Sequence, residues 1–118
     1  SKFYAESEFI HLYGVKKTRL ISILSSINRS YFEGLDDLSV IYSNKDALTS
    51  SGTHDKNGFY VPNKIEIYIY DESDNYIKYL ILHELKHHWC WRNRQEFNLD
   101  HKGCFLSTPI DNEYGFVE

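Results

Sequence analysis

Residues 75–92 have the sequence NYIKYLILHELKHHWCWR, which contains neither Gly nor Pro. Ser73 or Asp74, just before it, is a residue type that caps helix N-termini. At about 100° per residue, one broad arc of such a helix is apolar. The arc consists of Ile77, Ile81, Leu82, Leu85 and Trp89. The sequence therefore predicts one long helix that packs on the rest of the chain through this arc.

A second face of the same helix carries His83, Glu84 and His87 in the pattern H-E-x-x-H. Residues four apart lie one helical turn from each other, so both imidazoles can reach one ion. Zn²⁺ binds neutral imidazole, and a catalytic zinc site has three protein ligands and one position for water. A carboxylate beside the ion can take a proton from that water. The pattern predicts that His83 and His87 bind zinc, that Glu84 is the general base, and that this face lines a cleft.

Two downstream residues are candidates for the third zinc ligand. Glu113 follows Thr108 and Pro109, which predict the N-cap and the first residue of a short helix. His101 lies in the sequence HKGCF, residues 101–105, which is predicted to be a loop. Carboxylate and imidazole both bind zinc. Each of the two is therefore chemically competent, and the residues alone leave the choice open.

If Glu113 is the ligand, other side chains could donate a hydrogen bond to the oxyanion of a tetrahedral intermediate. The candidates are His101, Tyr114 and Tyr60. For the remaining histidines we expect structural or surface positions. His88 falls on the packing side of the helix, where a backbone carbonyl is its expected partner, whereas His11 and His54 are expected at the surface.

The rest of the chain predicts further helices and a small sheet. Helical spacing of apolar residues covers 15–32, and residues 3–13 are a short helix or an arm. Strand patterns occur at 38–42, 58–61 and 64–70, whereas 46–58 is rich in turn residues. The expected fold class is α+β, with N-terminal helices, a three-stranded sheet, the histidine-bearing helix and a short C-terminal helix that carries the glutamate.

Composition and charge narrow the class of protein. At 118 residues and 42% hydrophobic residues, the whole chain is expected to be a single domain. The net charge of −4 argues against nucleic-acid binding, and no apolar run reaches the length of a membrane span. Cys90 and Cys104 do not have the spacing of a zinc site or a disulfide scaffold. We therefore expect two reduced thiols and a cytoplasmic protein.

The chain resembles the gluzincin metallopeptidases in three successive features. These are a strand, the HELKHH helix and then the residues Asn112-Glu113-Tyr114-Gly115. The resemblance is to the minimal single-domain members and to the related peptidases that cut phage-type repressors. It covers residues 64–118 and implies a zincin-like fold, a protein or peptide substrate, and zinc held by His83, His87 and Glu113. It also implies that Glu84 is the base.

A rival resemblance is to SprT/Spartan-like peptidases, whose third ligand is a histidine in an H-G-x-x-F-like segment. Residues 101–105 are similar to that segment, with the glycine displaced by one position. This resemblance implies His101 as the third ligand. Between the two resemblances we favour the first, with Glu113 as the ligand, and keep His101 as the alternative.

The function that these patterns predict is zinc-dependent hydrolysis of peptide bonds. Residues 64–70, if they form an edge strand, could align an extended substrate by main-chain pairing. The alternative from another class is a non-catalytic metal-binding or degenerate peptidase module that recognises a protein partner. The intact Glu84 favours the enzyme, because a purely structural zinc site has no use for a base.

Overall fold

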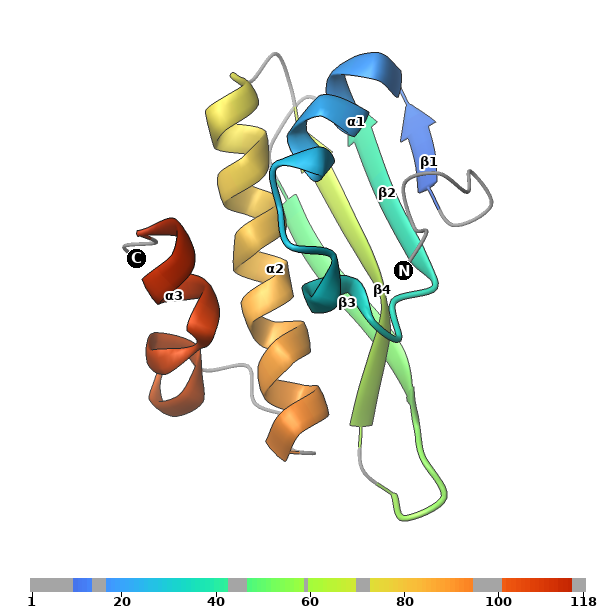
Figure 1. Cartoon of the computed structure of the whole chain (residues 1–118). Helices are drawn as coiled ribbons and strands as arrows, with labels where there is room; N and C mark the ends of the chain where they lie inside the picture. Colours follow the sequence, from blue (N-terminus) through green and yellow to red (C-terminus); the bar gives the residue numbers. More distant parts are fainter. Residues whose placement is uncertain are drawn as a thin grey trace.

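The computed structural model describes residues 10–13, 17–42, 47–58, 60–69, 73–94 and 101–115. These residues form both helices and strands, which agrees with the predicted α+β class (Figure 1). In chain order the elements are β1 (Ile10–Tyr13), α1 (Lys17–Ser25), the 3₁₀ helix η2 (Arg29–Phe32), β2 (Asp37–Tyr42), β3 (Ala47–His54), β4 (Tyr60–Ile69), α2 (Asp74–Arg94), the 3₁₀ helix η3 (Gly103–Ser107) and α3 (Pro109–Tyr114).

The described part of the chain contains one four-stranded sheet, where three strands were predicted. Its strand order is β1-β2-β4-β3. β2 is parallel to both β1 and β4, and β3 is antiparallel to β4. β4 is therefore an inner strand, so the hypothesis that it aligns a substrate as an edge strand is wrong. Among the described strands, β1 and β3 form the two edges.

β3 occupies most of the region that was predicted to be turns. Its sequence, ALTSSGTH, has no apolar alternation, and the strand forms because each of its residues finds a partner on β4. A tight turn over residues 55–58 then connects the two strands. Asn57 N–H donates to Asp55 Oδ1 over 2.8 Å, and Gly58 adopts a φ of 85°, which favours glycine.

β4 runs without interruption through Pro62, although this residue was expected to separate two strands. The pairing of β2 with β4 begins at Asp37 and Lys64, whereas Pro62 pairs only with Gly52 of β3, next to a register shift. At Pro62 the strand thus has a neighbour on one side only. A residue without a backbone N–H is tolerated there.

The N-terminal part also differs from the prediction. Residues 10–13 form β1 within the predicted arm, and residues 1–9 lie outside the described part. α1 ends at Ser25, well before residue 32. The hydroxyls of Ser25 and Ser26 donate to backbone carbonyls three residues back, and Asn28 then caps η2 by accepting from Ser30 N–H. These side chains compete with helical bonding and break the predicted helix.

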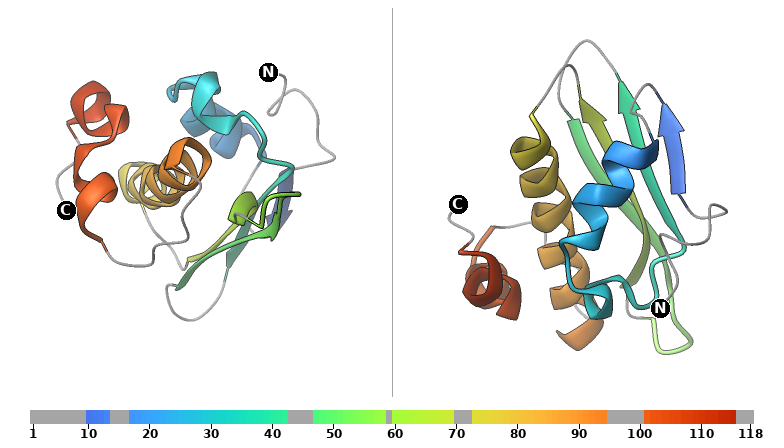
Figure 2. Two further views of the ribbon diagram at one scale, coloured as in Figure 1. Left: turned by 90° about the horizontal axis from the view of Figure 1, so that it is seen from below. Right: turned by 45° about the horizontal axis from the view of Figure 1, so that its top comes forward.

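α1 and α2 pack on the same face of the sheet (Figures 1 and 2). That face presents Leu38 and Val40 from β2 and Ile65 and Ile67 from β4, all fully buried. The predicted apolar arc of α2 is confirmed, since Ile77, Ile81, Leu82 and Leu85 are buried and Trp89 packs against the core. We call the sheet with α1 and α2 the platform.

Residues 101–115, which we call the C-terminal segment, lie on the side of α2 away from α1 and the sheet (Figures 1 and 2). α2 is therefore covered from two sides, and every residue from 80 to 88 is buried. This explains how a helix with charged residues in its middle can lie inside the molecule.

Cys90 on α2 and Cys104 in η3 form a disulfide, so the prediction of reduced thiols is wrong. The spacing of two cysteines could not reveal that η3 folds back onto α2. The cytoplasmic location rested partly on those thiols and stays a prediction. Among the described helices, none is long and apolar enough to cross a membrane.

Candidate metal centre

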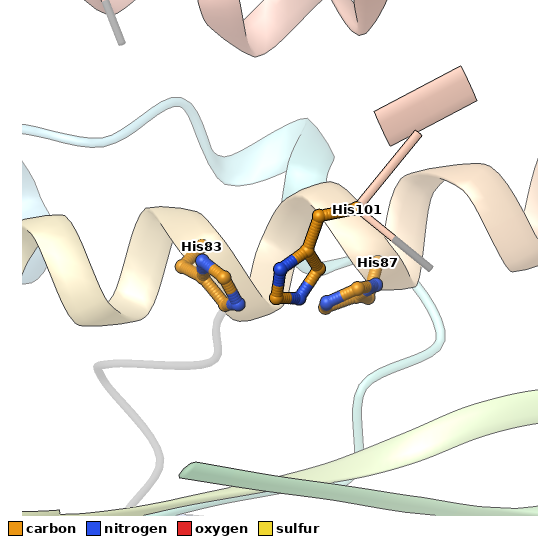
Figure 3. Close-up of side chains that lie close together, drawn as sticks. All are labelled: His83, His87 and His101. Atoms are coloured by element: carbon orange, nitrogen blue, oxygen red, sulfur yellow. The ribbon is translucent and has the colours of Figure 1, made fainter. Parts of the chain in front are cut away.

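Three histidines from two parts of the chain come together beside α2. His83 and His87 project from successive turns of the helix, and His101 reaches them from the C-terminal segment (Figure 3). The ring of His101 lies between the other two, and one ring nitrogen from each histidine lies within 4.8 Å of the others. The ring centroids are 4.7 to 5.1 Å apart. We call these three side chains the histidine cluster.

The two helical histidines are less accessible than the sequence suggested. His83 and His87 are each only 7% exposed, so their face of α2 is covered rather than open along its length. His101 is exposed. The cluster is therefore reached from the side on which His101 lies.

Aromatic rings fix the orientation of the cluster. The buried ring of Phe105 lies with its centroid 4.6 to 5.0 Å from the ring centroid of each histidine. Trp91, one turn beyond His87, stacks on that imidazole at 5.4 Å. Apolar walls of this kind keep ligand side chains in place and limit the approach of water.

A buried ion pair holds the C-terminal segment to the helix. Lys86, inside the H-E-x-x-H pattern, is 1% exposed, and its Nζ donates to Asp111 Oδ1 over 2.7 Å. The same ammonium lies 4.1 Å from the centroid of Phe105. Asp111 also accepts from the N–H and hydroxyl of Thr108. One side chain of α2 thus contacts both η3 and α3.

Glu84 lies next to the cluster. Its Oε2 is 3.8 Å from Nε2 of His83, and the residue is only 4% exposed. A carboxylate at this position can exchange a proton with a molecule bound between the histidines. The place is the one that the sequence predicted for a general base.

Burial puts His87 in the form that binds metals. Desolvation, together with the nearby His83, His101 and Lys86, lowers the pKa of the His87 imidazole to about 4. The ring is therefore neutral at pH 7 and keeps a lone pair for a metal ion.

The donor set fits zinc. Three neutral imidazoles and one free position are an established ligand set of catalytic zinc. Tetrahedral zinc with bonds of about 2.0–2.1 Å places its ligand nitrogens roughly 3.4 Å apart. The nitrogens here lie within 4.8 Å of each other, so small rotations of the side chains suffice. Harder cations such as Mg²⁺ and Ca²⁺ prefer oxygen ligands.

The structure brings His101, and not Glu113, to the two helical histidines. α3 begins at Pro109 with Thr108 as its cap, as predicted, but its orientation directs Glu113 elsewhere. The Glu113 carboxylate accepts a hydrogen bond of 2.6 Å from the hydroxyl of the buried Tyr31. Burial and this carboxylate raise the pKa of Tyr31 well above its usual range.

Tyr114, considered as an oxyanion donor, also has a different environment. Its hydroxyl accepts from Asn28 N–H over 2.6 Å, and its ring meets Tyr31 edge-on at 6.4 Å. Tyr114 is therefore not part of the histidine cluster. The side chain of Tyr60 lies outside the described residues.

The remaining histidines follow the prediction where they are described. His88 is buried, and its Nε2 lies 2.9 Å from the carbonyl oxygen of Glu33, the kind of partner that was predicted. Burial is the main cause that lowers the pKa of His88 to about 4. His54 is exposed, as expected. The side chain of His11 lies outside the described residues.

Sequence reasoning missed the residues that build the surroundings of the cluster. Lys86 was given no role, and Phe105 was counted only as part of a resemblance. A sequence signal existed for both: a lysine in the middle of an otherwise buried helix needs an anion, and Asp111 is an acidic residue in a predicted first turn. Nothing in the sequence indicated the disulfide.

Comparison of the chain with models of protein families, with curated protein sequences and with solved structures finds no match.

Proposed function

We propose that this protein is a zinc-dependent hydrolase of peptide bonds, with His83, His87 and His101 as metal ligands and Glu84 as general base. The observation that carries the proposal is the arrival of a third imidazole beside two helical ones, with a buried carboxylate 3.8 Å from His83. A purely structural zinc site closes its fourth position with protein and needs no base. We also propose a zincin-like fold, with the H-E-x-x-H helix packed on a mixed sheet.

In this reaction the histidine cluster, Glu84 and the two neighbouring aromatic residues each have a defined role. Zinc bound by the cluster would polarise the scissile carbonyl and lower the pKa of a bound water to about 7. Glu84 accepts a proton from the attacking water at its carboxylate and donates it to the leaving amine. Phe105 and Trp91 hold the imidazoles and exclude other water.

The strand that could align a substrate is β3. It is an edge of the sheet and contacts α2, which carries two ligands and the base. An extended peptide can add to such an edge by main-chain hydrogen bonds. This role replaces the one expected for residues 64–70.

The first test compares Glu84→Gln with Glu113→Gln, which makes the same chemical change outside the histidine cluster. Zinc content by plasma mass spectrometry should be about one per chain in both variants. Cleavage of a fluorogenic peptide library should fall at least about 100-fold in Glu84→Gln and stay near wild type in Glu113→Gln. Cleavage by Glu84→Gln at the wild-type rate would show that Glu84 is not the base.

A second pair of variants tests the third ligand. His101→Ala, left with two ligands, should bind zinc too weakly to retain it through purification, whereas Glu113→Ala should keep it. The reverse result would return the site to the gluzincin-type ligand set. If the wild-type protein supplied with zinc binds none, the hydrolase proposal fails. If it binds zinc but cleaves no peptide, and no hydroxamate competes for the metal, a non-catalytic module remains.

A further inference from the structure

The disulfide joins the two parts of the chain that supply the histidine cluster. Cys90 lies three residues after His87 on α2, and Cys104 lies three residues after His101 in the C-terminal segment. Their Cα atoms are 6.0 Å apart. The bond therefore fixes the distance between the helix and the beginning of η3, close to the loop that carries His101.

The residues of that loop are more exposed than those that anchor the segment farther along the chain. His101, Lys102 and Gly103 are all exposed, and Lys102, at the N-cap of η3, makes no capping bond with its side chain. The buried contacts come later, at Phe105 and at the pairing of Lys86 with Asp111. The cross-link at Cys104 is thus a covalent attachment three residues from His101, whose own contacts are those of its ring with His83, His87 and Phe105.

We propose that the redox state of Cys90 and Cys104 controls the zinc affinity of the histidine cluster, the closed disulfide being the form that holds His101 in place. This inference rests on the proposed zinc site and adds its regulation. With the disulfide open, His83 and His87 remain together on one helix, but His101 belongs to a segment with more conformational freedom.

Opening the disulfide requires a reductant, and a dithiol is the class of compound that can supply the two electrons. One of its thiolates attacks Sγ of Cys104, which is partly exposed, whereas Cys90 is only 8% exposed. The Cys90 sulfur leaves as a thiolate and takes a proton. The second thiol of the reagent then displaces the Cys104 sulfur, which also takes a proton. Two electrons pass to the protein, and the reagent leaves as its own disulfide.

The expected effect follows from chain entropy. The two cysteines are separated by 14 residues, and a cross-link over a loop of this length removes conformations equivalent to roughly a hundredfold in an equilibrium constant. The contacts of Lys86 and Phe105 persist after reduction and retain part of that restriction. We therefore expect reduction to weaken zinc binding by about tenfold to a hundredfold.

The experiment measures zinc affinity by competition with a chromophoric chelator, before and after treatment with tris(2-carboxyethyl)phosphine. This phosphine reduces the disulfide to two thiols and becomes a phosphine oxide, with its oxygen taken from water. Wild type should bind zinc about tenfold or more weakly after treatment. The double variant Cys90→Ser with Cys104→Ser should show the weaker affinity throughout and no response to phosphine.

His101→Ala is the control that separates positioning from a general loss of structure. Its residual zinc affinity comes from two histidines on one helix and should be the same in both redox states. Equal weakening of wild type and His101→Ala would overturn the inference, because the disulfide would then act on the whole fold. Equal zinc affinity of oxidised and reduced wild type would overturn it too, and would leave the proposed function intact. Absence of zinc binding by the oxidised protein would overturn both.

Discussion

The platform and the C-terminal segment are stabilised by different kinds of contact. The platform buries a continuous set of aliphatic side chains between its sheet and two helices. The segment contributes only Ile110 and the partly buried Tyr114 to that core, and it is attached in addition by a disulfide, a buried ion pair and the bond between Tyr31 and Glu113. Two proposed zinc ligands lie on the platform and one on the segment. Zinc affinity should therefore follow the docking of the segment rather than the overall stability of the fold.

The largest effect should come from a cavity in the platform. Leu85 is fully buried, and Leu85→Ala is expected to lower the free energy of unfolding by about 2–5 kcal/mol. The matched control is Leu106→Ala in the segment, where the leucine is 56% exposed and the expected change is within about 0.5 kcal/mol. Urea unfolding of both variants measures the contrast. Similar losses would mean that Leu106 contributes to stability as much as a fully buried leucine does.

Removal of the buried ammonium of Lys86 should loosen the C-terminal segment and leave the platform unchanged. Lys86→Met leaves the partly exposed Asp111 without its cation, at an expected cost of about 2 kcal/mol, that of a lost hydrogen bond between charged groups. Hydrogen exchange should then accelerate in residues 101–115 and remain slow in β4. Lys78→Met is the control, since Lys78 lies 5.1 Å from the ring centroid of Tyr114 and is only half-buried. Acceleration spread evenly over the chain would argue against two separable regions.

A smaller effect is expected at the contact between the segment and η2. Tyr31→Phe removes the hydrogen bond to Glu113 and should cost about 1 kcal/mol in thermal unfolding. Zinc affinity should be unchanged, because neither residue belongs to the histidine cluster. In a double-mutant cycle with Glu113→Gln, the second change should cost little once the first is made. A loss of zinc in Tyr31→Phe would return Glu113 to the metal site.

The smallest effect concerns the sheet face away from the helices. Hydrogen bonds from Lys64 and Tyr68 lower the pKa of Glu66. Its folded pKa is below the unfolded value of 4.5, so its contribution is present above pH 4.5 and is lost as the pH falls through the folded pKa. Glu66→Gln should therefore destabilise the protein by about 0.5 kcal/mol at pH 7 and hardly at all at pH 2. An equal loss at both pH values would show that packing, not charge, is responsible.

The sequence predicted the elements whose own residues carry a periodic pattern. Residues 75–92 were recognised as a helix because their apolar arc repeats at helical spacing, and the structure extends it to Asp74–Arg94. The cap at Thr108 was recognised because its geometry is local. β3 was missed because its residues have no pattern of their own and depend on pairing with β4.

The candidate site divides in the same way. His83, Glu84 and His87 could be assigned from one helical turn, which fixes their positions relative to each other. The choice between His101 and Glu113 depends on how η3 and α3 return to the helix. That return is set by Lys86, Phe105 and the disulfide, all of which act across tertiary contacts. Spacing along the chain carries no information on such contacts.

The short sequence separations around the histidine cluster have a consequence for the order of folding. The disulfide joins residues 14 apart and the Lys86 pair joins residues 25 apart, whereas Tyr31 and Glu113 are 82 apart. Loop-closure entropy rises with separation, and local contacts form faster than distant ones. Of these three contacts, we therefore expect the disulfide and the Lys86 pair to form early and the bond between Tyr31 and Glu113 to form last. A refolding chain would thus bring its metal-binding residues together before η2 docks on α3.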